Sequence, residues 1–64
     1  MKFHIPNMTC GGCVRGVTAS IQDVDPNAQV KADLEHKTIE VTSHLDASRI
    51  KKALDADDFP ATQI

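Results

Sequence analysis

The sequence predicts an α+β fold, the ferredoxin-like βαββαβ sandwich, in which two helices cover one face of a four-stranded antiparallel sheet. Two observations predict it. The chain has 64 residues, enough for one small domain that spans residues 1–64. Segments whose apolar residues alternate with polar ones are interrupted by two segments whose apolar residues recur at helical spacing. Because there is no Trp, no Tyr and only two Phe, the core must be mainly aliphatic.

The first half of the chain predicts a strand, a loop and a helix. Phe3 and Ile5 alternate with polar residues, which predicts a strand that ends at Pro6. A loop follows, and the helix is expected to begin at Cys13. Its apolar residues recur at helical spacing and are Val14, Val17, Ile21 and Val24. Pro26 lies in the segment that ends this helix.

The second half predicts a β-hairpin, a second helix and a last strand. Residues 28–34 and 38–42 both show strand alternation, and a tight turn connects them. Asp46 is a suitable N-cap for a helix whose apolar face ends near residue 56. Residues 59–64 are expected to form the last strand. In this topology the loop after the first strand, the hairpin turn and the turn before the last strand lie at the same end of the sandwich.

Composition and charge exclude several classes of function. The formal net charge is −2, whereas a nucleic-acid-binding domain needs clustered basic residues and aromatic side chains for base stacking. No segment has the roughly 20 apolar residues of a membrane helix, and the first residues do not resemble a signal peptide. We therefore expect a cytoplasmic protein that binds no nucleic acid and does not insert into the membrane.

The segment Met8-Thr9-Cys10-Gly11-Gly12-Cys13 contains both cysteines of the chain. In a reducing compartment, two cysteines separated by two residues indicate a metal or redox site rather than a structural disulfide. Unpaired N–H groups and the helix dipole favour a thiolate at the start of a helix, and Arg15 adds positive charge nearby. We expect the two glycines to permit backbone conformations that a Cβ would hinder, so that both sulfurs can converge on one ion.

Thiolate chemistry favours a soft metal ion at this motif. Thiolates select Cu(I), whereas a structural zinc site needs four ligands, and the chain has neither a second cysteine pair nor two histidines at zinc-ligand spacing. Thr9, which precedes Cys10, is not a carboxylate that could bind Zn(II) or Cd(II) as a hard ligand. The sequence therefore predicts a Cu(I) site on Cys10 and Cys13.

The motif and the predicted fold together resemble the heavy-metal-associated (HMA) domain family, which includes bacterial copper chaperones and the N-terminal metal-binding domains of copper-transporting P-type ATPases. Residues 8–13 match the M-T-C-x-x-C signature of that family, in the expected place between a strand and a helix. The resemblance implies that Cys10 and Cys13 carry Cu(I) and pass it by ligand exchange to a copper-transporting ATPase domain or another copper acceptor. It also admits a metal-bridged homodimer. No bond in a substrate is broken, so no enzyme is predicted.

Three alternatives stay open at this point. The chain is either free-standing, which its first Met and its last predicted strand favour, or an excised domain of a transporter. Mercury-binding relatives share the motif, so Hg(II) or Zn(II) is an alternative cargo. A small thiol-disulfide redox protein would use the same cysteines, but thioredoxin-like proteins are larger and usually have a proline between or near them.

Four other side chains carry atoms that can bind a metal ion, but we expect no ligand role for His4 and His44, which we interpret as solvated surface residues. Met8 has a thioether, but we interpret it as a plug that anchors the loop on the core. His36, in the hairpin turn, could reach an ion shared between two molecules, although turn residues of this kind are usually only exposed. His4 is expected on the uncovered face of the sheet and His44 at the end far from the cysteines.

Three aspartates, Asp55, Asp57 and Asp58, follow the second helix, where the helix dipole disfavours negative charge. From the topology we expect Asp57, Asp58 and Phe59 beside the cysteines. The three aspartates are either solvated surface or an acidic rim that docks a basic partner. The family commonly has Gly-Tyr or Gly-Lys where this chain has Asp58-Phe59. Phe59 cannot donate a hydrogen bond to a thiolate, so this departure concerns metal affinity and partner choice more than metal identity.

Overall fold

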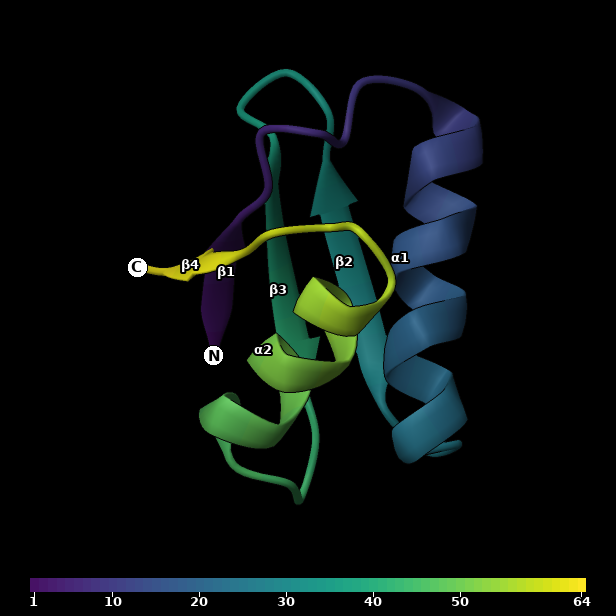
Figure 1. Ribbon diagram of the computed structural model, residues 1–64, viewed down its shortest axis with the longest axis vertical. Helices are drawn as coiled ribbons and strands as arrows, with labels where there is room; N and C mark the ends of the chain where they lie inside the picture. The colour runs from purple at the N-terminus through teal and green to yellow at the C-terminus, as the bar shows by residue number, and fades with distance from the viewer.

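The computed structural model describes residues 1–64. The elements are β1 (Lys2–His4), α1 (Gly11–Val24), β2 (Gln29–Asp33), β3 (Thr38–Thr42), α2 (Ala47–Ala56) and β4 (Thr62–Gln63). The strands form one sheet in the order β2-β3-β1-β4, and every neighbouring pair is antiparallel. Both helices lie on one face of this sheet (Figure 1). The predicted ferredoxin-like βαββαβ sandwich is therefore confirmed.

The core lies between the helices and the sheet. Its buried apolar residues are Phe3, Ile5, Met8, Val17, Ile21, Ala28, Ile39, Val41, Ile50, Leu54 and Ala61. Strand residues alternate between the two faces, so Phe3 is buried while Lys2 is exposed and His4 lies on the face without helices. Val17 and Ile21 are one turn apart on the core side of α1. Neither helix is long and apolar enough to cross a lipid bilayer.

Helix α1 begins at Gly11, two residues before the predicted start at Cys13. Cys10 is its N-cap, with an extended backbone (φ −154°, ψ 170°), and the Cys10 carbonyl accepts a hydrogen bond from the Val14 N–H at 3.2 Å. Gly11 and Gly12 are therefore helical and not part of the predicted loop, despite the low helix propensity of glycine. The later turns of α1 pack on the sheet through Val17 and Ile21 and so stabilise the helix. The first turn continues this packed helix towards its N-terminus.

The hairpin and the second helix form as predicted. Strands β2 and β3 pair along their whole length, with Val30 opposite Val41. Lys37, at the end of the turn, has a left-handed backbone with φ 56°. The Asp46 carboxylate accepts a hydrogen bond from the Arg49 N–H at 3.0 Å, which confirms it as the N-cap of α2.

Strand β4 is shorter than the predicted strand over residues 59–64. It comprises only Thr62–Gln63. Pro60 has no N–H to donate, and the Ala61 N–H donates to Asp55 Oδ1 at 3.1 Å instead of to a strand. Regular pairing with β1 is therefore possible only after this point.

The carboxylates of Asp55 and Asp57, at the end of α2, have hydrogen-bond partners within the fold. Asp55 Oδ2 lies 2.6 Å from Lys51 Nζ, and Asp55 Oδ1 accepts the hydrogen bond from the Ala61 N–H. These two donors offset the unfavourable interaction of the Asp55 carboxylate with the helix dipole. Asp57 Oδ2 accepts a hydrogen bond from Ser20 Oγ at 2.5 Å. Ser20 follows Cys13 by about two helical turns, so the expectation that Asp57 lies beside the cysteines is wrong. The long-range hydrogen bond to α1 fixes its position instead.

A buried aspartate connects the end of α1 to the β3–α2 loop. Asp25 is only 2% exposed. It accepts hydrogen bonds from Ser43 Oγ at 2.5 Å and from the Asn27 N–H at 3.1 Å, and His44 Nδ1 lies 3.4 Å from its carboxylate. The Ser43 hydroxyl above all holds the pKa of Asp25 below its usual value, against the opposing effect of burial. His44 thus lies at the C-terminal end of α1, far from the cysteines, as predicted.

We predict that Asp25→Asn removes a pH-dependent part of the stability. Because the pKa of Asp25 is lower in the folded chain, its ionised form stabilises the fold above about pH 4, and this contribution is lost as the pH falls further. Thermal unfolding followed by circular dichroism should give the variant a lower Tm than the parent at pH 7. The gap should shrink as the pH falls from about 4 towards 3.

Three other aspartates with lowered pKa values, Asp33, Asp46 and Asp55, titrate in both proteins and cancel in this comparison. A gap in Tm of constant size between pH 7 and pH 3 would contradict the assignment to Asp25.

Candidate metal centre

Cys10 and Cys13 lie at the N-terminal end of α1, with their Sγ atoms 3.4 Å apart. Both are free thiols; Cys10 is exposed, and Cys13 is partly buried against the core. The loop that carries them and the hairpin turn lie at the same end of the molecule (Figure 1), and the Ile5 N–H donates to the Lys37 carbonyl at 2.7 Å between them. The two sulfurs therefore form an open pair at the surface, at the end predicted from the topology.

The surroundings favour the thiolate form of Cys13. The Thr9 backbone, as the largest influence, and then the Cys10 side chain hold the pKa of Cys13 below its usual value, while partial burial opposes them. The start of α1 directs unpaired N–H groups to this end, and no residue before Gln22 is acidic. Cys13 is thus prepared to act as a thiolate ligand.

The two glycines between the cysteines are not needed for an unusual backbone conformation. No glycine in the chain has a positive φ. A Cβ at Gly11 would meet nothing within 4 Å, and a Cβ at Gly12 would lie 3.7 Å from Cys10 Sγ and 3.8 Å from Arg15 Nη2, which are ordinary contacts. The expectation of a special conformation is wrong because both residues belong to the regular first turn of α1. These distances also confirm that Arg15 brings positive charge close to the thiols.

Met8 anchors the loop that leads to Cys10. Its side chain is completely buried in the core. Its N–H donates to the Ile5 carbonyl at 3.0 Å, which turns the chain back over the core. The interpretation of Met8 as a plug is confirmed, and its thioether is not accessible to an ion that approaches from solvent.

None of the three histidines joins the cysteines. His4 lies on β1 and His44 beside Asp25, as described above. His36 lies in the hairpin turn at the end where the cysteines lie, and its Nδ1 is 2.8 Å from Asp33 Oδ2. No His, Asp or Glu completes a group of three ligands with the two cysteines.

A second cluster of metal-ligating side chains was not predicted from the sequence. Asp33, Glu35 and His36 are exposed, and their ligand atoms lie within 4.8 Å of one another. The sequence contains these residues as the pattern D-x-E-H in the predicted turn, but only His36 was interpreted as a possible metal ligand. Carboxylate oxygens suit harder ions than thiolates do. The cysteine pair is therefore the one site of soft donors in the structure.

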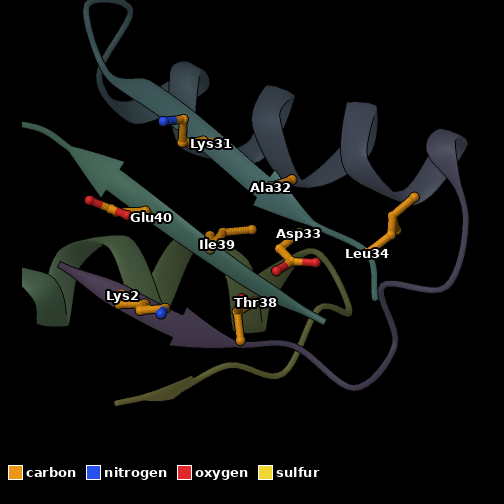
Figure 2. Close-up of a pocket in the computed structure, with 8 residues that line it drawn as sticks. All are labelled: Lys2, Lys31, Ala32, Asp33, Leu34, Thr38, Ile39 and Glu40. Atoms are coloured by element: carbon orange, nitrogen blue, oxygen red, sulfur yellow. The ribbon is translucent and has the colours of Figure 1, made fainter. Parts of the chain in front are cut away.

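The largest hollow in the surface lies on the face of the sheet without helices. It has a volume of about 470 Å³ and is lined by Lys2, Lys31, Ala32, Asp33, Leu34, Thr38, Ile39 and Glu40. Figure 2 shows Lys2, Lys31 and Glu40 on three neighbouring strands, and the strand register places Glu40 opposite both lysines. The hollow contains no cysteine and no histidine. It is therefore a solvated, charge-balanced surface apart from the metal centre.

The structure thus combines a βαββαβ sandwich with an open pair of thiols at the start of its first helix. Residues 2–57 match the heavy-metal-associated domain family, and the chain belongs to this family. It is a metal-carrying protein and not an enzyme.

Solved structures of similar proteins have the same fold. A gold-binding protein has 39% sequence identity and a TM-score of 0.97, over 100% of this chain and 98% of that chain. The copper chaperone Atx1 from Synechocystis PCC6803, in a trimeric form, has 26% identity and a TM-score of 0.94, over 97% and 98% of the two chains. Oxidized MerP from Ralstonia metallidurans CH34 has 23% identity and a TM-score of 0.85, over 97% and 90%. No match was found among curated protein sequences.

The burial of Met8 generates a prediction about stability. Met8→Ala should lower the free energy of unfolding by about 2–5 kcal/mol, because it opens a cavity in the core. Met8→Leu, which keeps the volume but removes the sulfur, should cost less than about 1.5 kcal/mol. Urea unfolding measures both. If the thioether were a ligand, Met8→Leu would lose copper against a chelator while its stability stayed near that of the parent.

Proposed function

We propose that this protein is a carrier of Cu(I), which it binds on the Sγ atoms of Cys10 and Cys13. The observation that supports this most directly is the pair of free sulfurs, 3.4 Å apart, at the open N-terminal end of α1. Because a metal–thiolate bond is about 2.3 Å long, two sulfurs on one ion lie at most about 4.6 Å apart. A small rotation of the side chains is then enough to receive an ion.

The composition of the site favours low coordination. Only two donors are present, because no carboxylate or imidazole completes a third position and Met8 is buried. Zn(II) in a protein usually takes four ligands, whereas soft thiolates select Cu(I). Two protein ligands leave the ion open on one side.

This open side suggests how the ion is passed on. The exposed Cys10 sulfur allows a thiolate of an acceptor to approach and form a three-coordinate bridge. The bond to one cysteine would then break, a second thiolate of the acceptor would bind, and the bond to the other cysteine would break last, so that copper stays Cu(I) throughout. Ligand exchange of this kind needs no oxidant and no reductant.

The acceptor we propose is a metal-binding domain of a copper-transporting P-type ATPase, or another copper acceptor with a thiolate pair of its own. The copper chaperone among the similar structures supports this class of partner. We propose a cytoplasmic location, where thiols stay reduced and available. A metal-bridged homodimer would use the same open face, so that dimer formation and transfer would compete.

Au(I) is a second candidate cargo, and the gold-binding protein with 39% identity favours it. Au(I) and Cu(I) are both soft, singly charged ions that accept two thiolates. Mass spectrometry of the protein after incubation with one equivalent of each ion distinguishes them. We expect the copper-loaded form to predominate, and predominance of the gold-loaded form would make Au(I) the main cargo.

We predict that Cys10→Ser and Cys13→Ser each abolish tight retention of Cu(I). Loss of a direct ligand should weaken binding by more than the roughly 10–100-fold typical for its outer partners. The fold should persist, since neither thiol forms a disulfide and Cys10 is exposed. Competition with a Cu(I) chelator under anaerobic conditions measures the affinity, and circular dichroism monitors the fold.

His4→Ala and His44→Ala serve as controls, because neither side chain belongs to the thiol pair, and both should bind copper like the parent. If a single serine variant competed with the chelator as well as the parent, the two-thiolate site would be wrong. Catalytic turnover in a disulfide-reduction assay, together with failure to hold Cu(I), would instead support a thiol-disulfide redox protein.

A further inference from the structure

We propose that Phe59 is a positioning residue for the metal centre. Its ring packs against Gly16 and thereby sets how close the first two turns of α1, with Cys13, lie to the α2–β4 connection. The proposal rests on the proposed function, because it concerns Cys13 as a ligand of the metal ion.

One side of α1 carries the contacts on which this inference depends. Cys13, Gly16 and Ser20 follow one another at spacings of three and four residues, so they lie along the same side of the helix. A Cβ at Gly16 would lie 2.9 Å from Phe59 Cζ and 3.3 Å from Cε2. One turn further on, Ser20 Oγ donates to Asp57 Oδ2. The α2–β4 connection therefore holds α1 at the two turns that directly follow Cys13.

The connection is itself held in place, so it cannot easily move away from the helix. The Phe59 N–H donates to the Leu54 carbonyl at 2.9 Å, and Asp58 has a left-handed backbone with φ 65°. Asn7 Nδ2 donates to the Asp58 carbonyl at 3.3 Å. Asn7 belongs to the loop that leads to Cys10. The same connection thus contacts the chain before the first cysteine and the helix after the second.

A displacement at Gly16 must reach Cys13. The two residues are one turn apart in a continuous hydrogen-bonded helix, which moves as a unit. Cys13 and Phe59 are both partly buried and pack against the core. Each cysteine thus has one support: Met8 below the loop of Cys10, and Phe59 beside the helix that carries Cys13. Phe59 acts through the backbone of α1, without being a ligand.

Four proteins test the proposal: the parent, Gly16→Ala, Phe59→Leu and the double variant. A methyl group at position 16 collides with Cζ and Cε2 of Phe59, and leucine lacks both atoms. We expect Gly16→Ala to weaken Cu(I) retention against a chelator by about tenfold, since overpacking forces a backbone shift. Phe59→Leu should weaken it less, and the double variant should recover most of the loss, as contacting residues do in a double-mutant cycle.

A stability control separates positioning from simple unfolding. Alanine is a better helix former than glycine, and this gain offsets part of the cost of overpacking. Gly16→Ala should therefore unfold at a temperature close to that of the parent. Ile50→Val, which trims the core in the first half of α2, shows how much copper retention responds to a loss of stability alone. Its Cu(I) affinity should equal that of the parent.

Amide NMR of the metal-free proteins gives a readout that does not depend on copper. The resonances of residues 10–13 should shift in Gly16→Ala and return towards the parent positions in the double variant. Parental copper retention in Gly16→Ala, or the same loss in Gly16→Ala and in the double variant, would overturn the proposal. If the parent itself did not retain Cu(I), the proposed function would fail. The amide shifts would then decide the positioning role: coupled shifts would support it, and uncoupled shifts would refute it.

Discussion

The placement of the first turn of α1 is the constraint on which the proposed metal centre depends. Val17 and Ile21 fix the later turns of the helix on the sheet, while Met8 fixes the loop that enters it. Between these two anchors lie Cys10, which is the N-cap, and the first turn of the helix, in which Gly11 and Gly12 precede Cys13. The sulfurs can therefore meet without a ligand to bring them together, and their separation follows from packing on either side of them.

The same turn combines weak local stability with access for a partner. Glycine is about 1 kcal/mol less favourable than alanine in a helix, so Gly11 and Gly12 make the first turn depend on tertiary packing. Their missing side chains also leave the surface around Cys10 open, which ligand exchange requires. The polar group around Asp25 lies at the other end of α1 and contributes to stability without contact with the site. Stability and access are thus provided by different ends of one helix.

Periodicity and capping chemistry were sufficient to predict the sandwich, the hairpin, the Asp46 cap and the burial of Met8, because each is a local pattern or follows from the topology. Local patterns did not predict features of the structure that depend on contacts with residues far away in the sequence. The early start of α1 depends on packing of its later turns, and the short β4 depends on Pro60 and on the carboxylate of Asp55. The contact of Phe59 with Gly16 joins residues 43 positions apart, and no spacing in the sequence indicates it. For the metal, the motif predicts the donor atoms, while their separation is visible only in three dimensions.

X-ray absorption at the copper K-edge tests the central claim most directly, on protein loaded with one equivalent of Cu(I) under reducing conditions without added thiols. The account predicts a first shell of sulfur alone, with two sulfur atoms per copper in the monomer and none contributed by Met8. A shell that contains nitrogen or oxygen, or only one sulfur atom per copper, would contradict a carrier that holds its ion on Cys10 and Cys13.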